Sequence, residues 1–247
     1  MCETYRDRLW QRRLSYEQQE NKIALLSGML DCVLMGTGDW LMLYGDPTIT
    51  GISYWLTEGA AQIPAWRNAL SMALGFPATV FYAIGLFGIG AFLREEKQRK
   101  TWFVMNAFGL TPWLCIHIFV AGALFLFAWL RGSVWAAAAM PAAEAFRGQF
   151  GWVVYLSYPL MLPPYFYWAW QLFRGKSVFP KWMALLNPIT FYLVLKGISL
   201  LMPVSPFRIA FTNGLMSEAM FLWFASMLPW NSFGEGDHIG GHSPSSL

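Results

Sequence analysis

Six long apolar runs, separated by short polar segments, constrain this chain more than any other feature of its sequence. They cover residues 23–44, 68–93, 101–130, 150–172, 182–202 and 207–228. A helix needs about 20 apolar residues to cross the hydrocarbon core of a bilayer. Hydrophobic residues make up 56% of the 247 and charged residues only 13%, which excludes an ordinary soluble domain. The sequence therefore predicts an all-α fold, a transmembrane bundle of six helices.

The polar segments predict an orientation and three parts. Twelve Lys and Arg residues lie on the side of the N-terminus and four on the other side, and loops rich in these residues face the cytoplasm. We therefore expect both termini in the cytoplasm. The parts are a polar cytoplasmic segment over 1–22, the six-span domain over 23–228, and a Gly- and Ser-rich tail over 229–247 that we expect to be disordered.

Two stretches depart from simple spans. Residues 131–149 contain an apolar run that is too short to cross a bilayer, so we expect a surface or re-entrant helix there. The next span, 150–172, contains Pro159, Pro163 and Pro164, and proline inside a helix removes a hydrogen bond. We therefore expect this span to be broken, with freed carbonyl groups that find partners in protein or water.

A short sequence match links the two halves of the chain. IPAWRNAL at 63–70 and FPKWMALL at 179–186 share a Pro-x-Trp core, and each opens a predicted span. If the first three spans and the last three are related, the odd number in each unit gives opposite orientations, as in many transporters. Proline also suits the first turn of a helix and tryptophan the membrane interface. A 3+3 inverted repeat is therefore left open.

Ionisable and polar side chains inside or beside the spans are the candidates for function. The first span alone carries Asp31 and Asp39, and a carboxylate in hydrocarbon costs at least ~2.5 kcal/mol unless an interior site compensates it. We therefore predict a polar cavity that is open towards the outer face. Its predicted ligand-binding residues are Asp31, Asp39, Arg67, His117, Lys196, Arg208, Asn213 and Glu218.

Pairing of opposite charges is expected within this set, because an unpaired buried ion is costly. We predict that Asp39 pairs with Lys196 or Arg208. Glu218 is predicted to pair with His117 or Lys196. Such pairs also hold helices together without any further function, so a purely structural role stays open for each of them.

Three classes of function are compatible with a buried polar cavity. The leading hypothesis is proton-coupled binding and translocation of a small molecule or ion, with Asp31, Asp39 or Glu218 taking up the proton or cation. The second is an intramembrane enzyme acting on a lipid or isoprenoid-like substrate, with His117 or Glu218 as general acid or base. The third is a chromophore protein, in which Lys196, the only lysine within a span, forms a Schiff base with an acidic counterion. A structural membrane subunit whose polar residues face a partner helix is a fourth possibility. Whether the protein is an enzyme is left open.

Several partners and cofactors are not indicated. The net charge is only +3 and the basic residues lie between the spans, so no nucleic acid is expected. The sequence contains neither GxSxG nor HExxH, and its spans hold no cluster of histidines with carboxylates, so no metal site is predicted. The cofactor is unknown. The expected partners are the lipid bilayer and a small-molecule or ion ligand, and a homo-oligomer is left open.

Four short segments carry a resemblance to known sequences. They are GTGDWLMLYGD at 36–46, PAWR at 64–67, FPKW at 179–182 and NP at 187–188. In these segments the chain resembles bacterial multi-pass integral membrane proteins of unknown function. The resemblance implies a multi-pass protein of the bacterial inner (cytoplasmic) membrane. It implies no activity, cofactor or catalytic residue.

Overall fold

The described part of the chain is helical. The computed structural model describes residues 2–45 and 62–230, in which the only strand-like pairing is one isolated bridge between Leu93 and Ser177. The elements are α1 (Cys2–Leu43), α3 (Ala65–Gly88), the 3₁₀ helix η2 (Ile89–Phe92), α4 (Glu96–Arg131), α5 (Ala136–Phe173), the 3₁₀ helix η3 (Lys181–Leu185), α6 (Pro188–Leu201) and α7 (Pro206–Met227). The predicted all-α fold is confirmed.

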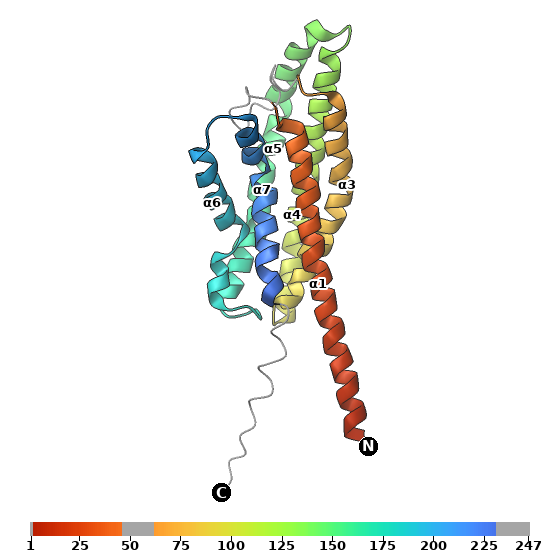
Figure 1. Cartoon of the computed structure of the whole chain (residues 1–247), viewed down its shortest axis with the longest axis vertical. Coiled ribbons are helices and arrows are strands. Elements are labelled where there is room, and N and C mark those ends of the chain that lie inside the picture. The colour runs from red at the N-terminus through yellow and green to blue at the C-terminus, as the bar shows by residue number, and fades with distance from the viewer. Residues whose placement is uncertain (1, 46–61, 231–247) are drawn as a thin grey trace.

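The six α-helices run up and down along one long axis (Figure 1). Helix α1 packs against α3 and α7, α4 packs against α3 and α5, and α6 packs mainly against α7. We call the end at which α1 and α4 finish the upper end, and the end at which α3, α5 and α7 finish the lower end, as in Figure 1. The beginning of α1 projects beyond the lower end, so the first and last helices of the bundle start and finish on the same side.

Length and hydropathy identify one helix among the described residues that can cross a membrane. It covers Ala65–Phe92 and so joins α3 to η2. Ile116–Arg131 and Pro188–Leu201 are apolar but shorter. A core helix of a soluble protein passes the same test, so the six-span bundle stays a prediction at this point.

The predicted break at the prolines of the fourth span is wrong. Helix α5 is continuous over Ala136–Phe173 and contains Pro141, Pro159, Pro163 and Pro164. It also includes most of 131–149, where a separate surface or re-entrant helix was expected. Packing against α4 is the physical reason, because tertiary contacts override the local helix preference of proline.

The fifth apolar run forms a shorter helix than predicted. Residues 181–185 adopt the 3₁₀ helix η3, and α6 begins only after Asn187. The Asn187 side chain accepts hydrogen bonds from the backbone N–H groups of Ile189 and Thr190, and Pro188 occupies the first turn. These are typical signals of a helix start. Helix α6 therefore has 14 residues, which corresponds to about 21 Å.

No helix end marks the predicted border at residue 22. Helix α1 continues without interruption across residue 22, the predicted border of the first span. The predicted tail over 229–247 lies outside the described residues beyond Trp230. Both matched segments of the proposed repeat open a helix directly after a proline, but Pro64 precedes α3 and Pro180 precedes a 3₁₀ helix. The inverted repeat stays a prediction.

Two apolar clusters fill the bundle, one towards each end. The largest fully buried side chains belong mostly to the lower cluster, and they include Trp102, Trp168, Trp223, Tyr82, Tyr165 and Phe224. The upper cluster consists of Met42, Leu43, Ala121, Leu124, Phe127, Ala139, Ala143 and Ile209. Asp39 on α1, His117 on α4 and Ser217 on α7 lie between the parts of these helices that belong to the two clusters.

Glycines allow α1 and α3 to cross at very short distance in the lower half. A Cβ atom on Gly85 would lie 2.7 Å from the Cα atom of Gly28, and a Cβ atom on Gly28 would lie 2.4 Å from the ring of Phe224. Real Cβ atoms essentially never approach other atoms so closely. This crossing fixes the distance between the first two helices, and it therefore also sets the geometry of the polar residues above it.

Candidate functional site

A carboxylate–imidazole centre lies in the upper half of the bundle, between the two apolar clusters. The His117 ring on α4 contacts the Asp39 carboxylate on α1, with 3.2 Å between Nδ1 and Oδ1. The Ser217 hydroxyl on α7 donates a hydrogen bond to the other oxygen, Oδ2, of Asp39 at 3.1 Å. His117 is 5% exposed and the Asp39 side chain is 18% exposed. The two groups are thus enclosed by protein, and Asp39 is the more accessible of them.

The second ring nitrogen of His117 faces Ser71 of α3. Nε2 lies 3.0 Å from the Ser71 carbonyl oxygen and 3.2 Å from the Ser71 hydroxyl oxygen. The carbonyl can only accept a hydrogen bond, whereas the hydroxyl can also donate one. A doubly protonated ring donates at Nε2 to the carbonyl, and a neutral ring with its proton at Nδ1 accepts from the hydroxyl. Ser71 therefore offers a partner to either protonation state of His117.

Small residues make room for the imidazole. A Cβ atom on Gly38 would lie 2.8 Å from Cε1 of His117, and a Cβ atom on Gly75 would lie 2.9 Å from Cδ2. The ring is thus held between the backbones of α1 and α3, which have no side chain at these two positions. Four helices contribute to the centre, namely α1 with Asp39, α3 with Ser71, α4 with His117 and α7 with Ser217.

Glu218 lies beside the centre and is held by Trp40. The Trp40 indole N–H donates a hydrogen bond to Oε1 of Glu218 at 3.1 Å. The other oxygen, Oε2, is buried and has no hydrogen-bond partner among the described residues. Arg67 donates from Nη2 to the Trp40 carbonyl oxygen at 3.2 Å, near the end of α1. The predicted residues Asp39, Arg67, His117 and Glu218 therefore come together in one region.

Asp31 lies two helical turns below Asp39 and forms a separate polar site. Its side chain is fully buried, and its Oδ1 atom has no partner among the described residues. The Cys32 thiol is a weak donor at 3.9 Å from Oδ2. A buried carboxyl oxygen without a donor is costly. Packing therefore does not explain why the chain carries a carboxylate at position 31.

We expect Asp31→Asn to stabilise the protein and Asp39→Asn to destabilise it. The first substitution keeps the shape and removes an ionisable group that lacks a partner, and we expect a gain of about 1 kcal/mol in the free energy of unfolding. The second weakens charge-assisted bonds to His117 and Ser217, and we expect a loss of about 1–3 kcal/mol. Thermal unfolding of both variants measures this contrast. A loss of stability in Asp31→Asn would mean that this carboxylate has a partner in the folded protein.

The remaining predicted site residues lie elsewhere, and the predicted ion pairs are wrong. The Lys196 ammonium makes no ion pair with any described residue, and it lies on α6, which packs mainly against α7. Arg208 donates to the Met202 carbonyl oxygen at 2.9 Å and so satisfies the end of α6. Asn213 donates to the Ile209 carbonyl oxygen of its own helix. Asp39 pairs with a histidine, and Glu218 accepts from a tryptophan.

Sequence reasoning missed Ser71 as a site residue. The buried positions of α3 include Asn68, Ser71, Gly75, Ala78 and Tyr82, which follow one another at intervals of three or four residues. This spacing places them on one face of a helix. The polar and small residues on an otherwise apolar helix were the available signal, because such a face packs inward against polar groups.

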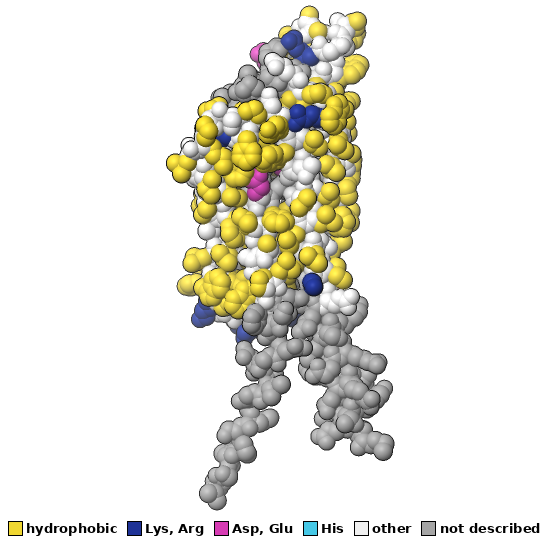
Figure 2. All heavy atoms as spheres, in the orientation of Figure 1, with side chains coloured by type: hydrophobic (Ala, Val, Ile, Leu, Met, Phe, Trp, Pro, Cys, Tyr) yellow, Lys and Arg dark blue, Asp and Glu magenta, His cyan; other side chains and the backbone are white. Residues whose placement is uncertain are grey.

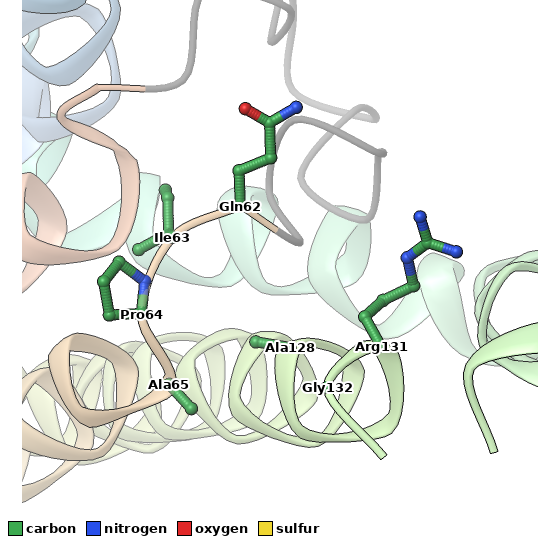
Figure 3. Close-up of a pocket in the computed structure, with 7 residues that line it drawn as sticks. All are labelled: Gln62, Ile63, Pro64, Ala65, Ala128, Arg131 and Gly132. Atoms are coloured by element: carbon green, nitrogen blue, oxygen red, sulfur yellow. The ribbon is translucent and has the colours of Figure 1, made fainter. Parts of the chain in front are cut away.

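A shallow hollow of about 370 Å³ lies at the upper end, between the start of α3 and the end of α4. Its lining consists of Gln62, Ile63, Pro64, Ala65, Ala128, Arg131 and Gly132. Figure 3 shows the polar ends of Gln62 and Arg131 reaching away from the helix axes on the same side. None of these residues belongs to the carboxylate–imidazole centre, so the hollow and the centre are separate features.

The centre resembles a nucleophilic triad in its contacts but not in its surroundings. Serine, histidine and aspartate are linked in the order that hydrolases use. However, the Ser71 side chain is fully buried, and Ser71 lies inside α3, where the neighbouring backbone N–H groups bond within the helix. No backbone donors are thus available there to stabilise an oxyanion. The arrangement suits binding and exchange of a proton better than attack on a carbonyl carbon.

Comparison with known proteins places the chain in a family. A family of unknown function, DUF6796, matches residues 16–232. The chain belongs to this family. The match includes every residue of the carboxylate–imidazole centre, as well as Asp31 and Glu218. No curated protein and no solved structure matches the chain.

Proposed function

We propose that this member of DUF6796 is a multi-pass membrane protein that binds and translocates a small molecule or ion, coupled to a proton on the Asp39–His117 pair. In this proposal all six α-helices cross the inner membrane, and both termini lie in the cytoplasm. The observation that carries the proposal is the double role of Ser71, which can accept from a protonated His117 and donate to a neutral one.

The distribution of apolar side chains supports the membrane location. Large hydrophobic residues are exposed on every α-helix of the bundle, and a soluble protein rarely exposes such a continuous apolar surface. Among them are Leu30 and Val33 of α1, Phe76 and Val80 of α3, Phe108 and Leu126 of α4, Trp152 and Phe166 of α5, Leu193 and Leu201 of α6, and Phe207 of α7. On the face in Figure 2, hydrophobic side chains cover most of the surface, with Lys and Arg towards both ends.

The burial of the most apolar helix supports the same location. A core helix of a soluble protein is mostly buried, whereas only 33% of the most apolar window of Ala65–Phe92 is buried. Polar residues instead lie inside, and Asn68, Ser71 and Asn106 are fully buried. Apolar side chains outside and polar ones inside are expected where hydrocarbon replaces water as the solvent.

The position of the pair within the bundle supports proton coupling. Asp39 is partly accessible and His117 is enclosed, so an entering cation or proton reaches the carboxylate before the imidazole. Glu218 lies beside them with one buried oxygen atom free of described partners. In Figure 2 a small acidic patch interrupts the hydrophobic surface in the upper half. Carboxylates and histidines inside membrane proteins commonly serve as proton relays.

An intramembrane acid–base enzyme is the second candidate. The alignment of Ser71, His117 and Asp39 favours it, because a histidine oriented by a carboxylate is a common general base. The two functions differ in one simple respect. An enzyme turns over its substrate in detergent without any gradient, whereas a carrier needs two compartments.

Proton movement in sealed vesicles tests the leading proposal. Vesicles containing the purified protein and an internal pH dye are exposed to single solutes from a panel of inorganic cations, amines and organic acids. We expect at least one solute to drive proton movement. We expect Asp39→Asn to reduce the initial rate of proton movement at least tenfold, because an amide, unlike a carboxylate, does not take up a proton.

Glu144→Gln is the matched control, since it makes the same chemical change at an exposed position of α5 and should leave the rate unchanged. An Asp39→Asn variant that folds and retains the full rate would refute proton coupling at this pair. Proton movement that is equally fast in vesicles without protein would refute the carrier function.

A further inference from the structure

A basic surface at the lower end is built from two turns that are far apart in the sequence. We call residues 92–100 and 174–181 together the basic clasp. Leu93 and Ser177 form an antiparallel bridge. The Arg94 N–H donates to the Lys176 carbonyl oxygen at 3.1 Å, and the Val178 N–H donates to the Phe92 carbonyl oxygen at 3.0 Å. Backbone hydrogen bonds thus hold the α3–α4 turn against the α5–η3 turn.

Local sequence explains why the second turn reaches the first. Gly175 has φ +70°, a left-handed conformation that glycine adopts without strain. The Gly175 N–H donates to the Leu172 carbonyl oxygen and the Lys176 N–H to the Gln171 carbonyl oxygen, as expected at a glycine-terminated helix end. The chain therefore reverses directly after α5 and places the next three residues beside the α3–α4 turn.

Side chains of the clasp are fixed by further hydrogen bonds. Arg94 donates from Nε to the Ser177 carbonyl oxygen at 2.9 Å, and Arg99 donates from Nε to the Leu93 carbonyl oxygen at 2.7 Å. Lys176 donates to Glu95 at 2.5 Å, and this hydrogen bond lowers the pKa of the Glu95 carboxyl below its ordinary value. Glu95 is therefore charged at neutral pH and is already occupied by a lysine.

The clasp carries a strong excess of positive charge. Its seven basic residues, Arg94, Lys97, Arg99, Lys100, Arg174, Lys176 and Lys181, stand against two acidic residues, Glu95 and Glu96. Glu96 pairs with Lys100 at 2.7 Å. Lys97, Arg174 and Lys181 are exposed and make no ion pair with a described acidic residue. At least three cationic groups thus remain available to an external anion.

Exposed aromatic and aliphatic side chains adjoin this charge on the side of the bundle. Trp170, Phe173, Val178 and Trp182 are all more than half exposed. The Arg174 guanidinium lies 5.7 Å from the centre of the Trp170 ring. Tryptophan is favoured at the level of lipid headgroups. Cations directly beside such residues therefore lie where the phosphates of a bilayer would lie.

We infer that the basic clasp binds the phosphate groups of anionic phospholipids in the leaflet at the lower end of the bundle, an inference that depends on the proposed membrane location. Complementary charge is the basis of recognition, and the hydrogen-bonded backbone of the clasp keeps the cations together. Because the two turns belong to different halves of the chain, a lipid bound there would also link α3 and α4 to α5.

Native mass spectrometry of the full chain in nonionic detergent tests this inference. The protein is titrated with phosphatidylglycerol or with zwitterionic phosphatidylcholine of the same acyl chains. We expect phosphatidylglycerol to bind at least tenfold more tightly. We expect Arg174→Gln/Lys181→Gln to reduce its affinity by about tenfold or more, because each basic residue near a headgroup contributes separately.

The matched control removes the same charge from the upper end, as Arg131→Gln/Arg147→Gln, and should change the affinity less than twofold. Equal binding of the two lipids, or an equal loss in the upper-end variant, would overturn the inference. Displacement of phosphatidylglycerol by millimolar inorganic phosphate would mean that the basic clasp binds free phosphate and not a lipid. An alkaline wash of the membranes tests the proposed membrane location separately from lipid binding. A protein that the wash releases is not membrane-integral, whatever lipid it binds.

Discussion

Gly85→Leu is expected to abolish the accumulation of folded protein. A Cβ atom at this position would lie 2.7 Å and 2.8 Å from the Cα and N atoms of Gly28, and a backbone cannot move aside as a flexible side chain can. Helices α1 and α3 would have to separate along the crossing. Gly85→Ala introduces the same Cβ atom alone, and we expect it to cost about 1–3 kcal/mol, the usual range for overpacking. Thermal unfolding followed by circular dichroism measures the second variant.

Gly197→Ala and Gly197→Leu are the matched controls. Gly197 also lies inside a helix, α6, but a Cβ atom there would meet no atom within 4 Å. Alanine has a higher helix propensity than glycine, by about 0.8–1.0 kcal/mol, so Gly197→Ala should stabilise the protein. The change from glycine to alanine is thus expected to lower the stability at position 85 and to raise it at position 197. Equal effects would mean that the close crossing of α1 and α3 does not exist in solution.

The helices of this fold could be predicted from the sequence, but the continuity of α5 could not. The helices were predictable because each apolar run is long and ends at Gly, Pro or charged residues. The continuity of α5 was not, because proline acts on the local backbone while packing against α4 acts on the whole helix. Sequence-based expectations about a break are therefore weakest where a helix is packed along its length.

The partner of Asp39 could not be predicted for a different reason. Sequence shows which helices carry charge, but not which helices are neighbours. Lys196 lies on α6, on the far side of α7 from α1. His117 lies on α4, and its ring fits between α1 and α3 because Gly38 and Gly75 have no side chain. These glycines decide the geometry, and their role is visible only once the helices are assembled. Asp39 and His117 were both predicted as site residues for their charge alone.

The Asp39–His117 pair is expected to show strong energetic coupling in a double-mutant cycle. Asp39→Ala leaves the His117 Nδ1 and the Ser217 hydroxyl without their acceptor, and His117→Ala leaves a partly buried carboxylate without a donor on one oxygen. Removing one partner of a buried pair typically costs 3–5 kcal/mol. The double variant should therefore be more stable than the sum of the single effects indicates, by about 1–3 kcal/mol. Unfolding in mixed micelles measures the four free energies.

An exposed pair on α4 provides the reference for this cycle. Glu96 and Lys100 lie 2.7 Å apart, with side chains 79% and 76% exposed, and such pairs one helical turn apart contribute only about 0.3–0.5 kcal/mol. Both cycles involve α4 and one carboxylate each, but the reference pair is exposed and lies within one helix. If the coupling of Asp39 with His117 is no larger than that of Glu96 with Lys100, the pair is not enclosed, and the proposal that it retains a proton inside the bundle fails with it. The alternative outcome is a large coupling, with an Asp39→Asn variant that folds but moves no protons in vesicles. In that case the same pair of residues contributes both to the stability of the upper half of the bundle and to proton movement.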